Sequence, residues 1–144
     1  MKTITRPINV LLVDDDDGDA KTLKRAFHKL GLDKIMTHAR DALEALDYLK
    51  GKNGKDRLKR PCILLVDLNM PRVNGLELIR IIRDDDDLKK LVIFILTTSD
   101  LEEDKQAAYK LHVAGYIVKQ TANDNFASLA DFVERYCKTV DLPL

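Results

Sequence analysis

Five short apolar runs alternate along the chain with five longer segments in which apolar residues recur at helical spacing. Three of the runs are apolar at every position instead of every second position. This pattern is typical of strands covered on both faces, as in a parallel sheet flanked by helices. We therefore predict strands at residues 8–13, 34–38, 62–66, 91–96 and 116–118.

The segments between these runs have the start and stop signals of helices. An apolar stripe through residues 20–30 can end at Gly31, and a last stripe covers residues 126–136. The other three helices begin with predicted capping boxes, in which a short polar side chain and a glutamate three residues later satisfy backbone donors. These pairs are Asp41 with Glu44, Asn74 with Glu77, and Ser99 with Glu102.

The resulting order, a strand and then a helix repeated five times, predicts an α/β fold. Parallel neighbours need crossover helices, and such crossovers are right-handed. We therefore predict a doubly wound five-stranded parallel sheet with strand order 2-1-3-4-5, a flavodoxin-like (βα)5 arrangement. The chain has 144 residues, the length of one domain. We expect residues 1–144 to form a single domain with no output domain attached.

Charge and hydropathy exclude several classes of protein. Lys plus Arg equal Asp plus Glu at 24 each, and this balance argues against a general nucleic-acid binder. The longest apolar run, residues 91–96, is too short to span a membrane, and the start of the chain lacks a signal peptide. The two cysteines show no metal-binding spacing. We expect a cytoplasmic protein with reduced thiols and without a membrane or nucleic-acid partner.

Three carboxylates are predicted to meet at one edge of the sheet. In this architecture ligands bind at the carboxyl ends of the strands, near the switch between the first and third strands. Asp14 and Asp15 follow the first strand, and Asp67 follows the third. A like-charged pair costs roughly 4 kcal/mol at about 4 Å and an effective dielectric constant near 20, so a proton or a cation is expected there. Hard oxygen ligands without a nearby imidazole or thiolate favour Mg²⁺ over zinc.

The tetrapeptide DDDD occurs twice, at residues 14–17 and 84–87, and its surroundings differ. The second run lies at the opposite edge of the predicted sheet, where we expect a solvated turn. The later aspartates of the first run, and Asp19, are expected to favour the start of a helix rather than to bind the metal. The basic segment 50–60 is predicted to be a solvated loop, with docking of an acidic partner as the alternative. The three histidines are interpreted as surface or packing residues without partners.

Two further strand ends complete a set of groups suited to phosphoryl transfer. The fourth strand ends at Thr97 and Thr98, which offer hydroxyl donors, and the fifth ends at Lys119, which offers a mobile positive charge. Together with the carboxylates, these residues supply a nucleophile, a metal site and donors for developing charge.

With these residues the sequence resembles the response regulator receiver domain, in the single-domain form of the chemotaxis regulators. The resemblance covers about residues 8–140. It rests on VDD at 13–15, DLNMPRVNG at 67–75, LTTS at 96–99 and GYIVK at 115–119. The opening acidic run, the basic segment and the short tail are also similar to the regulators that are paired with bacterial phytochromes.

The resemblance implies roles for the acidic residues. Asp67 would be the phosphoacceptor, and it would share a Mg²⁺ ion with Asp15 directly and with Asp14 partly through water. The backbone carbonyl of Asn69 would be a further ligand. The phosphoryl donor would be a histidine kinase, with a bacterial phytochrome as the candidate.

The resemblance also implies how a signal would leave the site. Thr97 and Lys119 would bind the phosphoryl group, and Tyr116 would turn inward when Thr97 moves. A downstream protein, or a second copy in a homodimer, would then dock on the face formed by the fourth helix, fifth strand and fifth helix. The sequence departs from the family at Gln120, where a proline is usual and the preceding bond is typically cis. Because a cis bond before a non-proline residue costs about 2.5–4 kcal/mol, we predict a trans bond between Lys119 and Gln120.

Two other classes of function remain as alternatives. An Asp-nucleophile, Mg²⁺-dependent phosphatase or phosphotransferase of the haloacid-dehalogenase type would act on an external substrate. Its nucleophile is followed two residues later by a second catalytic Asp, whereas Asp67 is followed by Asn69. A binding module independent of phosphate would not need the complete set of acids and lysine.

Overall fold

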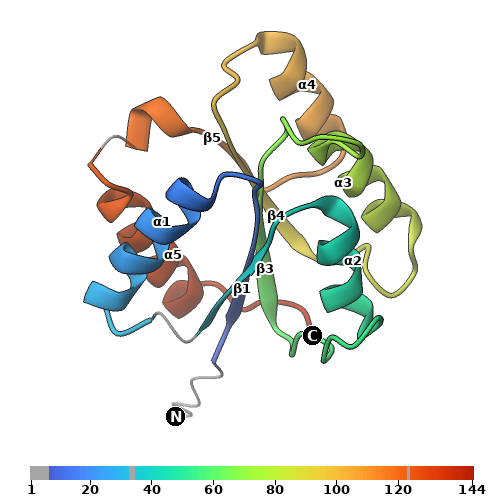
Figure 1. Cartoon of the computed structure of the whole chain (residues 1–144), viewed down its shortest axis with the longest axis horizontal. Helices are drawn as coiled ribbons and strands as arrows, with labels where there is room; N and C mark the ends of the chain where they lie inside the picture. The colour runs from blue at the N-terminus through green and yellow to red at the C-terminus, as the bar shows by residue number, and fades with distance from the viewer. Residues whose placement is uncertain (1–6, 33–34, 123) are drawn as a thin grey trace.

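The computed structural model describes residues 7–32, 35–122 and 124–144, and it shows a central parallel sheet between two layers of helices (Figure 1). The five strands are arranged in the order β2-β1-β3-β4-β5. The α/β fold and the strand order predicted from the sequence are therefore confirmed.

The elements alternate as predicted, with small shifts at their ends. The second strand begins at Met36, and Lys34, where its start was predicted, lies outside the described residues. The strands are β1 Asn9–Val13, β2 Met36–Ala39, β3 Cys62–Val66, β4 Val92–Thr97 and β5 Gly115–Val118. The helices are α1 Asp17–Lys29, α2 Ala42–Lys50, α3 Gly75–Asp84, α4 Glu102–Lys110 and α5 Ala127–Thr139, with a short 3-10 helix η2 at Lys119–Ala122.

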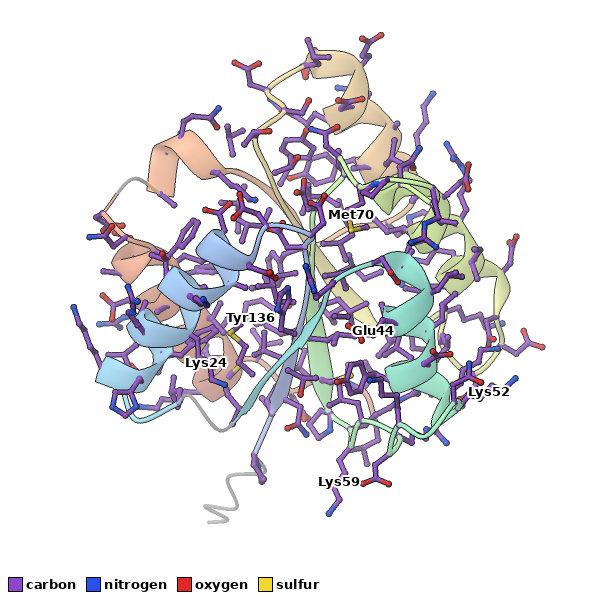
Figure 2. The ribbon with its side chains drawn as sticks, viewed as in Figure 1. Lys24, Glu44, Lys52, Lys59, Met70 and Tyr136 are labelled. Carbon is purple, nitrogen blue, oxygen red and sulfur yellow. The ribbon has the colours of Figure 1, made fainter. Side chains whose placement is uncertain are left out.

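Both faces of the sheet are covered, which explains the continuously apolar strands. Leu12 of β1 and Leu65 of β3 pack in the cluster formed with α1 and α5. Leu11 and Leu64, their neighbours along the same strands, pack in the opposite cluster, with α2, α3 and α4. Figure 1 shows α1 and α5 on one side of the strands and α2, α3 and α4 on the other. Every residue of β3 is buried, because this strand lies at the centre of the sheet, where side chains fill the space on both sides of it (Figure 2).

Two of the three predicted helix caps are present and the third is wrong. The Asp41 side chain accepts a hydrogen bond from the Glu44 backbone N–H, and Asn74 does the same for Glu77. Helix α4 instead has Leu101 at its N-cap position, without a side-chain cap. Ser99 lies two residues too early, and its hydroxyl donates to the Asp104 carboxylate. The sequence motif that starts at Ser99 therefore does not mark the start of α4, because the chain after β4 continues to Leu101 before the helix begins.

The second acidic run is a largely exposed turn, as predicted, and it also pairs with the basic segment 50–60. Asp85 forms an ion pair with Lys50 at 2.5 Å, and Asp87 forms one with Arg57 at 2.9 Å. Arg60 also donates to the backbone carbonyl of Asp87. The acidic partner of the basic segment is therefore this chain's own turn between α3 and β4. Ion pairs near the protein surface are screened by dissolved ions, so these contacts weaken as the salt concentration rises.

Both cysteines are free thiols, as the sequence predicts. Burial raises the pKa of Cys62 to about 11 and that of Cys137 to a similar value. The thiolate, which is the reactive form, is therefore scarce at neutral pH. In the part of the chain that the structure describes, no helix has the length and apolar character to cross a membrane.

Gly75, the first residue of α3, packs directly against the loop after β3. A Cβ atom at this position would lie 2.3 Å from the carbonyl oxygen of Asp67 and 2.8 Å from the Cα of Leu68. We expect Gly75→Ala to lower the free energy of unfolding by about 3 kcal/mol, because rigid backbone has to move. The measurement is urea unfolding followed by circular dichroism.

The matched control is Gly18, which lies in α1. A Cβ there would lie 3.1 Å from a carboxylate oxygen of the flexible Asp16 side chain. The gain in helix propensity, up to about 1 kcal/mol, favours alanine at Gly18. Equal midpoints of urea unfolding for Gly75→Ala and the wild type would show that the loop after β3 can move to admit a Cβ atom without loss of stability.

Candidate functional site

The parallel register of the central strands brings the predicted carboxylates together. Val13 of β1 pairs with Val66 of β3, so the next residue on each strand, Asp14 and Asp67, emerges at the same edge. The Asp67 backbone N–H donates to the Val13 carbonyl at 2.9 Å. Carboxylate oxygens of Asp14, Asp15 and Asp67 all lie within 4.8 Å of one another.

The three acids differ in their exposure to solvent. Asp14 is completely buried and Asp67 is 6% exposed, whereas Asp15 is exposed. Burial raises the pKa of Asp14 to about 6, against the lowering effects of hydrogen bonds from Lys119 and from the Asp16 backbone. A buried carboxylate beside two others depends on nearby positive charge to remain ionised.

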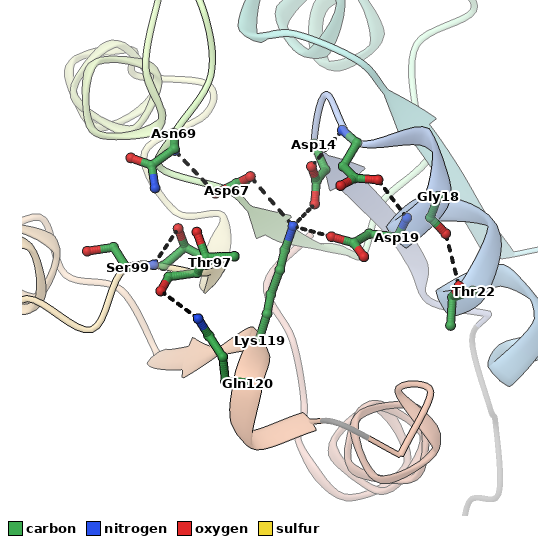
Figure 3. A network of polar contacts seen from close by, with 12 residues as sticks. Asp14, Gly18, Asp19, Thr22, Asp67, Asn69, Thr97, Ser99, Lys119 and Gln120 are labelled. Carbon is green, nitrogen blue, oxygen red and sulfur yellow. Dashed lines mark hydrogen bonds and ion pairs between the residues drawn. The ribbon is translucent and has the colours of Figure 1, made fainter.

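Lys119 supplies positive charge at the centre of the cluster. It follows β5, and its Nζ lies 2.7 Å from Asp14 and 2.7 Å from Asp19, but 3.6 Å from Asp67 (Figure 3). Burial by itself would lower the pKa of Lys119, but the hydrogen bonds to Asp14 and Asp19 outweigh it and raise that pKa. The side chain is therefore an ammonium group at neutral pH.

Asp19 is a member of the site that the sequence prediction missed. It was expected to favour the start of the helix, yet its carboxylate reaches Lys119 from the first turn of α1. A usable signal was its position one residue before Ala20, the first buried residue of this helix. Helical spacing therefore places Asp19 beside the buried face, at the end of the helix nearest the pocket.

The other acids of the first run behave as predicted. Asp16 is the N-cap of α1, and its side chain accepts a hydrogen bond from the Asp19 backbone at 3.0 Å. Asp17 forms an exposed ion pair with Arg40 at 3.1 Å. Neither belongs to the group of carboxylates that could hold a metal.

Thr97 comes to the site from the end of β4, whereas Asn69 lies two residues after Asp67 in the loop that follows β3. Thr97 is the last residue of β4, and it is fully buried. Its hydroxyl oxygen accepts a long hydrogen bond, 3.4 Å, from the Ser99 backbone. The Asn69 backbone N–H donates to the Asp67 carboxylate at 3.2 Å, which fixes the loop after β3 around the acid (Figure 3).

The loops after β4 and β5 are joined by side chains. The Tyr116 hydroxyl donates to the Ser99 carbonyl at 2.9 Å, and the Gln120 amide donates to the Thr98 carbonyl at 3.3 Å. The peptide bond between Lys119 and Gln120 is trans, as predicted, since the only cis bond within the described residues precedes Pro61. The lysine thus reaches the acids from the start of η2 without a proline after it.

His38 has a partner at the site, so the interpretation of the histidines as partnerless is wrong here. Its Nε2 lies 2.7 Å from the backbone carbonyl of Asp14. A carbonyl oxygen only accepts hydrogen bonds, so Nε2 carries a hydrogen and donates it. This contact links the end of β2 to the end of β1.

The donor set fits a hard divalent cation. Mg²⁺ takes oxygen ligands at about 2.0–2.1 Å in an octahedron, which puts ligand oxygens about 3 to 4 Å apart. Carboxylate oxygens already within 4.8 Å need only small side-chain movements to reach this arrangement. Asp14, Asp15 and Asp67 are the only such group in the described ranges. The site therefore combines a set of hard oxygen donors with an ammonium and a hydroxyl group, as phosphoryl transfer requires.

Comparison with known proteins agrees with this arrangement. The response regulator receiver domain family matches residues 10–131. Response regulator Rcp1 from Synechocystis sp. is 32% identical over 138 residues, which are 95% of this chain and 94% of that protein. The solved Mn²⁺-bound form of Rcp1 has a TM-score of 0.83 at 30% identity, covering 96% of this chain and 100% of that one.

A second solved structure is that of the phosphorylated cyanobacterial phytochrome response regulator RcpA. It has a TM-score of 0.84 at 29% identity, and the match covers 94% of this chain and 98% of that one. Similarity in sequence and in structure thus extends over nearly the whole of each relative.

Proposed function

The chain belongs to the response regulator receiver domain family, and we propose that it is a two-component signalling switch that accepts a phosphoryl group on Asp67. Receiver domains are signalling domains and not enzymes that turn over an external substrate. The observation that carries the proposal is the convergence of Asp14, Asp15 and Lys119 around the buried Asp67.

The proposed reaction transfers a phosphoryl group from a phosphohistidine. A carboxylate oxygen of Asp67 attacks the phosphorus, the P–N bond breaks, and the departing imidazole keeps the electron pair and takes up a proton. Lys119 and the Thr97 hydroxyl donate hydrogen bonds to the phosphoryl oxygens as charge develops on them. Asp14, Asp15, Asp67 and the Asn69 carbonyl would hold a Mg²⁺ ion. When bound, this ion supplies positive charge against the carboxylates and the phosphoryl oxygens.

The comparisons guide the choice of metal and donor. A divalent cation is supported by the donor chemistry of the acids and by the Mn²⁺-bound form of Rcp1. A histidine kinase is the proposed donor, and a bacterial phytochrome is the candidate, because RcpA is a phytochrome response regulator. Such kinases present their phosphohistidine in the cytoplasm, so we place the exchange there.

The proposed output begins at Tyr116. When Thr97 moves toward the phosphoryl group, the loop containing Ser99 moves with it, and the hydrogen bond from Tyr116 to Ser99 breaks. The tyrosine then turns inward and changes the face formed by α4, β5 and α5. Apolar side chains are already exposed on this face, at Tyr109 of α4 (47%) and Phe132 of α5 (44%). We propose that a downstream protein or a second copy docks there.

Incubation with acetyl phosphate and Mg²⁺ tests the proposal directly. A switch accumulates a labile phosphoprotein at no more than one phosphoryl group per chain, and EDTA prevents it. A phosphatase would instead release phosphate over many turnovers without accumulating label, and a phosphate-independent binding module would do neither. Intact-mass spectrometry together with a phosphate-release assay separates the three outcomes.

Self-association through this face has its own test. We expect Tyr109→Glu to weaken a homodimer by roughly tenfold or more, because a charge is buried at an apolar contact. Leu43→Glu is the matched control, since Leu43 is 54% exposed on α2, outside the face. Sedimentation velocity measures both variants with and without phosphodonor. A wild-type protein that stays monomeric at high concentration in both conditions would exclude the dimer and leave partner docking as the output.

A further inference from the structure

Lys119 forms an ion pair but no short hydrogen bond with the proposed phosphoacceptor in the resting site. Its Nζ lies 2.7 Å from an oxygen of Asp14 and 2.7 Å from an oxygen of Asp19. The nearest oxygen of Asp67 is 3.6 Å away, beyond the usual hydrogen-bond length. Figure 3 shows the ammonium group with Asp14 and Asp19 on one side and Asp67 on the other.

The two carboxylates that hold Lys119 differ in a way that matters for activation. Asp14 belongs to the group that could bind a metal, so metal binding would draw its carboxylate away from the lysine. Asp19 is outside that group and would keep its charge and its position beside Lys119. Its side chain is 34% exposed, against 1% for Asp14, so it can be hydrated when the lysine leaves.

We propose that Asp19 is a positioning residue that holds Lys119 in a resting position and competes with the phosphoryl group for it. This inference rests on the proposed phosphorylation of Asp67. A ligand that needs Lys119 in a different position can bind only when the lysine is in that position. Its apparent affinity therefore falls as the fraction of molecules with Lys119 in that position falls. Asp19 therefore lowers the affinity of the site for a phosphoryl group and favours the unphosphorylated state.

The contact also connects phosphorylation to the first helix. Asp19 lies in the first turn of α1, and its backbone N–H is held by the N-cap Asp16. When Lys119 moves to the phosphoryl group, the Asp19 carboxylate loses its partner while the cap remains. The negative charge of Asp19 is then no longer paired, so the surface at the start of α1 becomes more negative while the helix stays folded.

Beryllium fluoride with Mg²⁺ provides a stable probe of the phosphorylated site. Its dissociation constant is measured by isothermal titration calorimetry on the full chain, with Mg²⁺ saturating for each variant. We expect Asp19→Asn to bind beryllium fluoride about fivefold more tightly than the wild type, the effect of removing one partly buried ionic hydrogen bond. Asp19→Glu, which restores the charge, should return the affinity toward the wild-type value.

Asp17→Asn is the matched control, because it removes the same charge from the same turn of α1 but touches Arg40 instead of Lys119. We expect it to change the affinity by less than about twofold, since exposed charges are screened. Equal tightening in both variants would reduce the effect to general charge and overturn the proposal. Weaker binding in Asp19→Asn would overturn it too, because Asp19 would then assist the phosphoryl group.

Two further checks separate the possible failures. A wild-type protein that binds no beryllium fluoride in the presence of Mg²⁺ contradicts the proposed function. If the wild type does bind it, the affinities of the Asp19 and Asp17 variants test the role of Asp19 alone. If Asp19→Asn loses its cooperative unfolding transition, Asp19→Ala replaces it in the same titration. The side chain of Asp19 pairs with Lys119 and is not the cap of α1, so both variants are expected to fold.

Discussion

Replacing Asp67 with asparagine should remove phosphoryl labelling from acetyl phosphate, with a loss of at least about a thousandfold in rate. Asparagine has nearly the same shape, but its amide lacks the anionic oxygen that would attack phosphorus. Labelling of the wild type should be sensitive to hydroxylamine, as expected of an acyl phosphate, and absent from Asp67→Asn. Intact-mass spectrometry after a fixed incubation gives the occupancy of both proteins.

Stability provides the control for this variant. Asp67 lies in a cluster of carboxylates and is only 3.6 Å from Lys119, so its removal relieves repulsion while losing a weak attraction. We expect the midpoint of urea unfolding for Asp67→Asn to equal that of the wild type or to lie at a higher urea concentration. Labelling that persisted at the wild-type level would mean that another residue is the nucleophile, and Asp67 would then lose the role proposed for it.

Asp15→Ala should weaken Mg²⁺ binding by about a hundredfold or more, because it removes one of the three carboxylates proposed to hold the ion. Asp15 is exposed, in contrast to Asp14, so the substitution leaves no cavity or unpaired buried group behind. The affinity is measured by calorimetric titration with Mg²⁺, and far-ultraviolet circular dichroism checks the fold.

The second acidic run provides a control of the same chemistry. The side chain of Asp86 is 97% exposed and pairs with Lys89, three residues further on. We expect Asp86→Ala to change the Mg²⁺ affinity by less than about twofold, because exposed charges beyond the Debye length are screened. Similar losses for Asp15→Ala and Asp86→Ala would show that the ion responds to diffuse negative charge and not to a defined site.

In this pocket several groups compete for one lysine, Lys119. Asp14 is buried and needs positive charge nearby, and Lys119 meets that need in the resting site. The proposed metal would meet it in the active site and would leave the lysine free to move. Asp19 then decides how readily that movement occurs. The buried carboxylates, the ammonium group and the helix-borne acid are therefore best analysed as one coupled unit.

The sequence by itself determined the sheet, the strand order and the edge at which the acids meet. Its reasons are local: continuous apolar runs need cover on both faces, and a polar residue directly after such a run must lie at the strand's end. That is why the positions of Asp14 and Asp67 at one edge could be predicted although they are distant in the chain. The caps at Asp41 and Asn74 were predictable for the same reason, since both partners lie within one helical turn.

Only the tertiary structure decided which long or polar side chains pair across elements. Lys119 with Asp19, His38 with Asp14, and Arg57 with Asp87 are separated by 100, 24 and 30 residues. Periodicity indicates the face on which a residue lies, but a partner depends on how neighbouring elements are aligned and how far a flexible side chain reaches. The predicted cap at Ser99 was wrong for the same reason, because the path of the chain after β4 places the start of α4 two residues later, after Leu101.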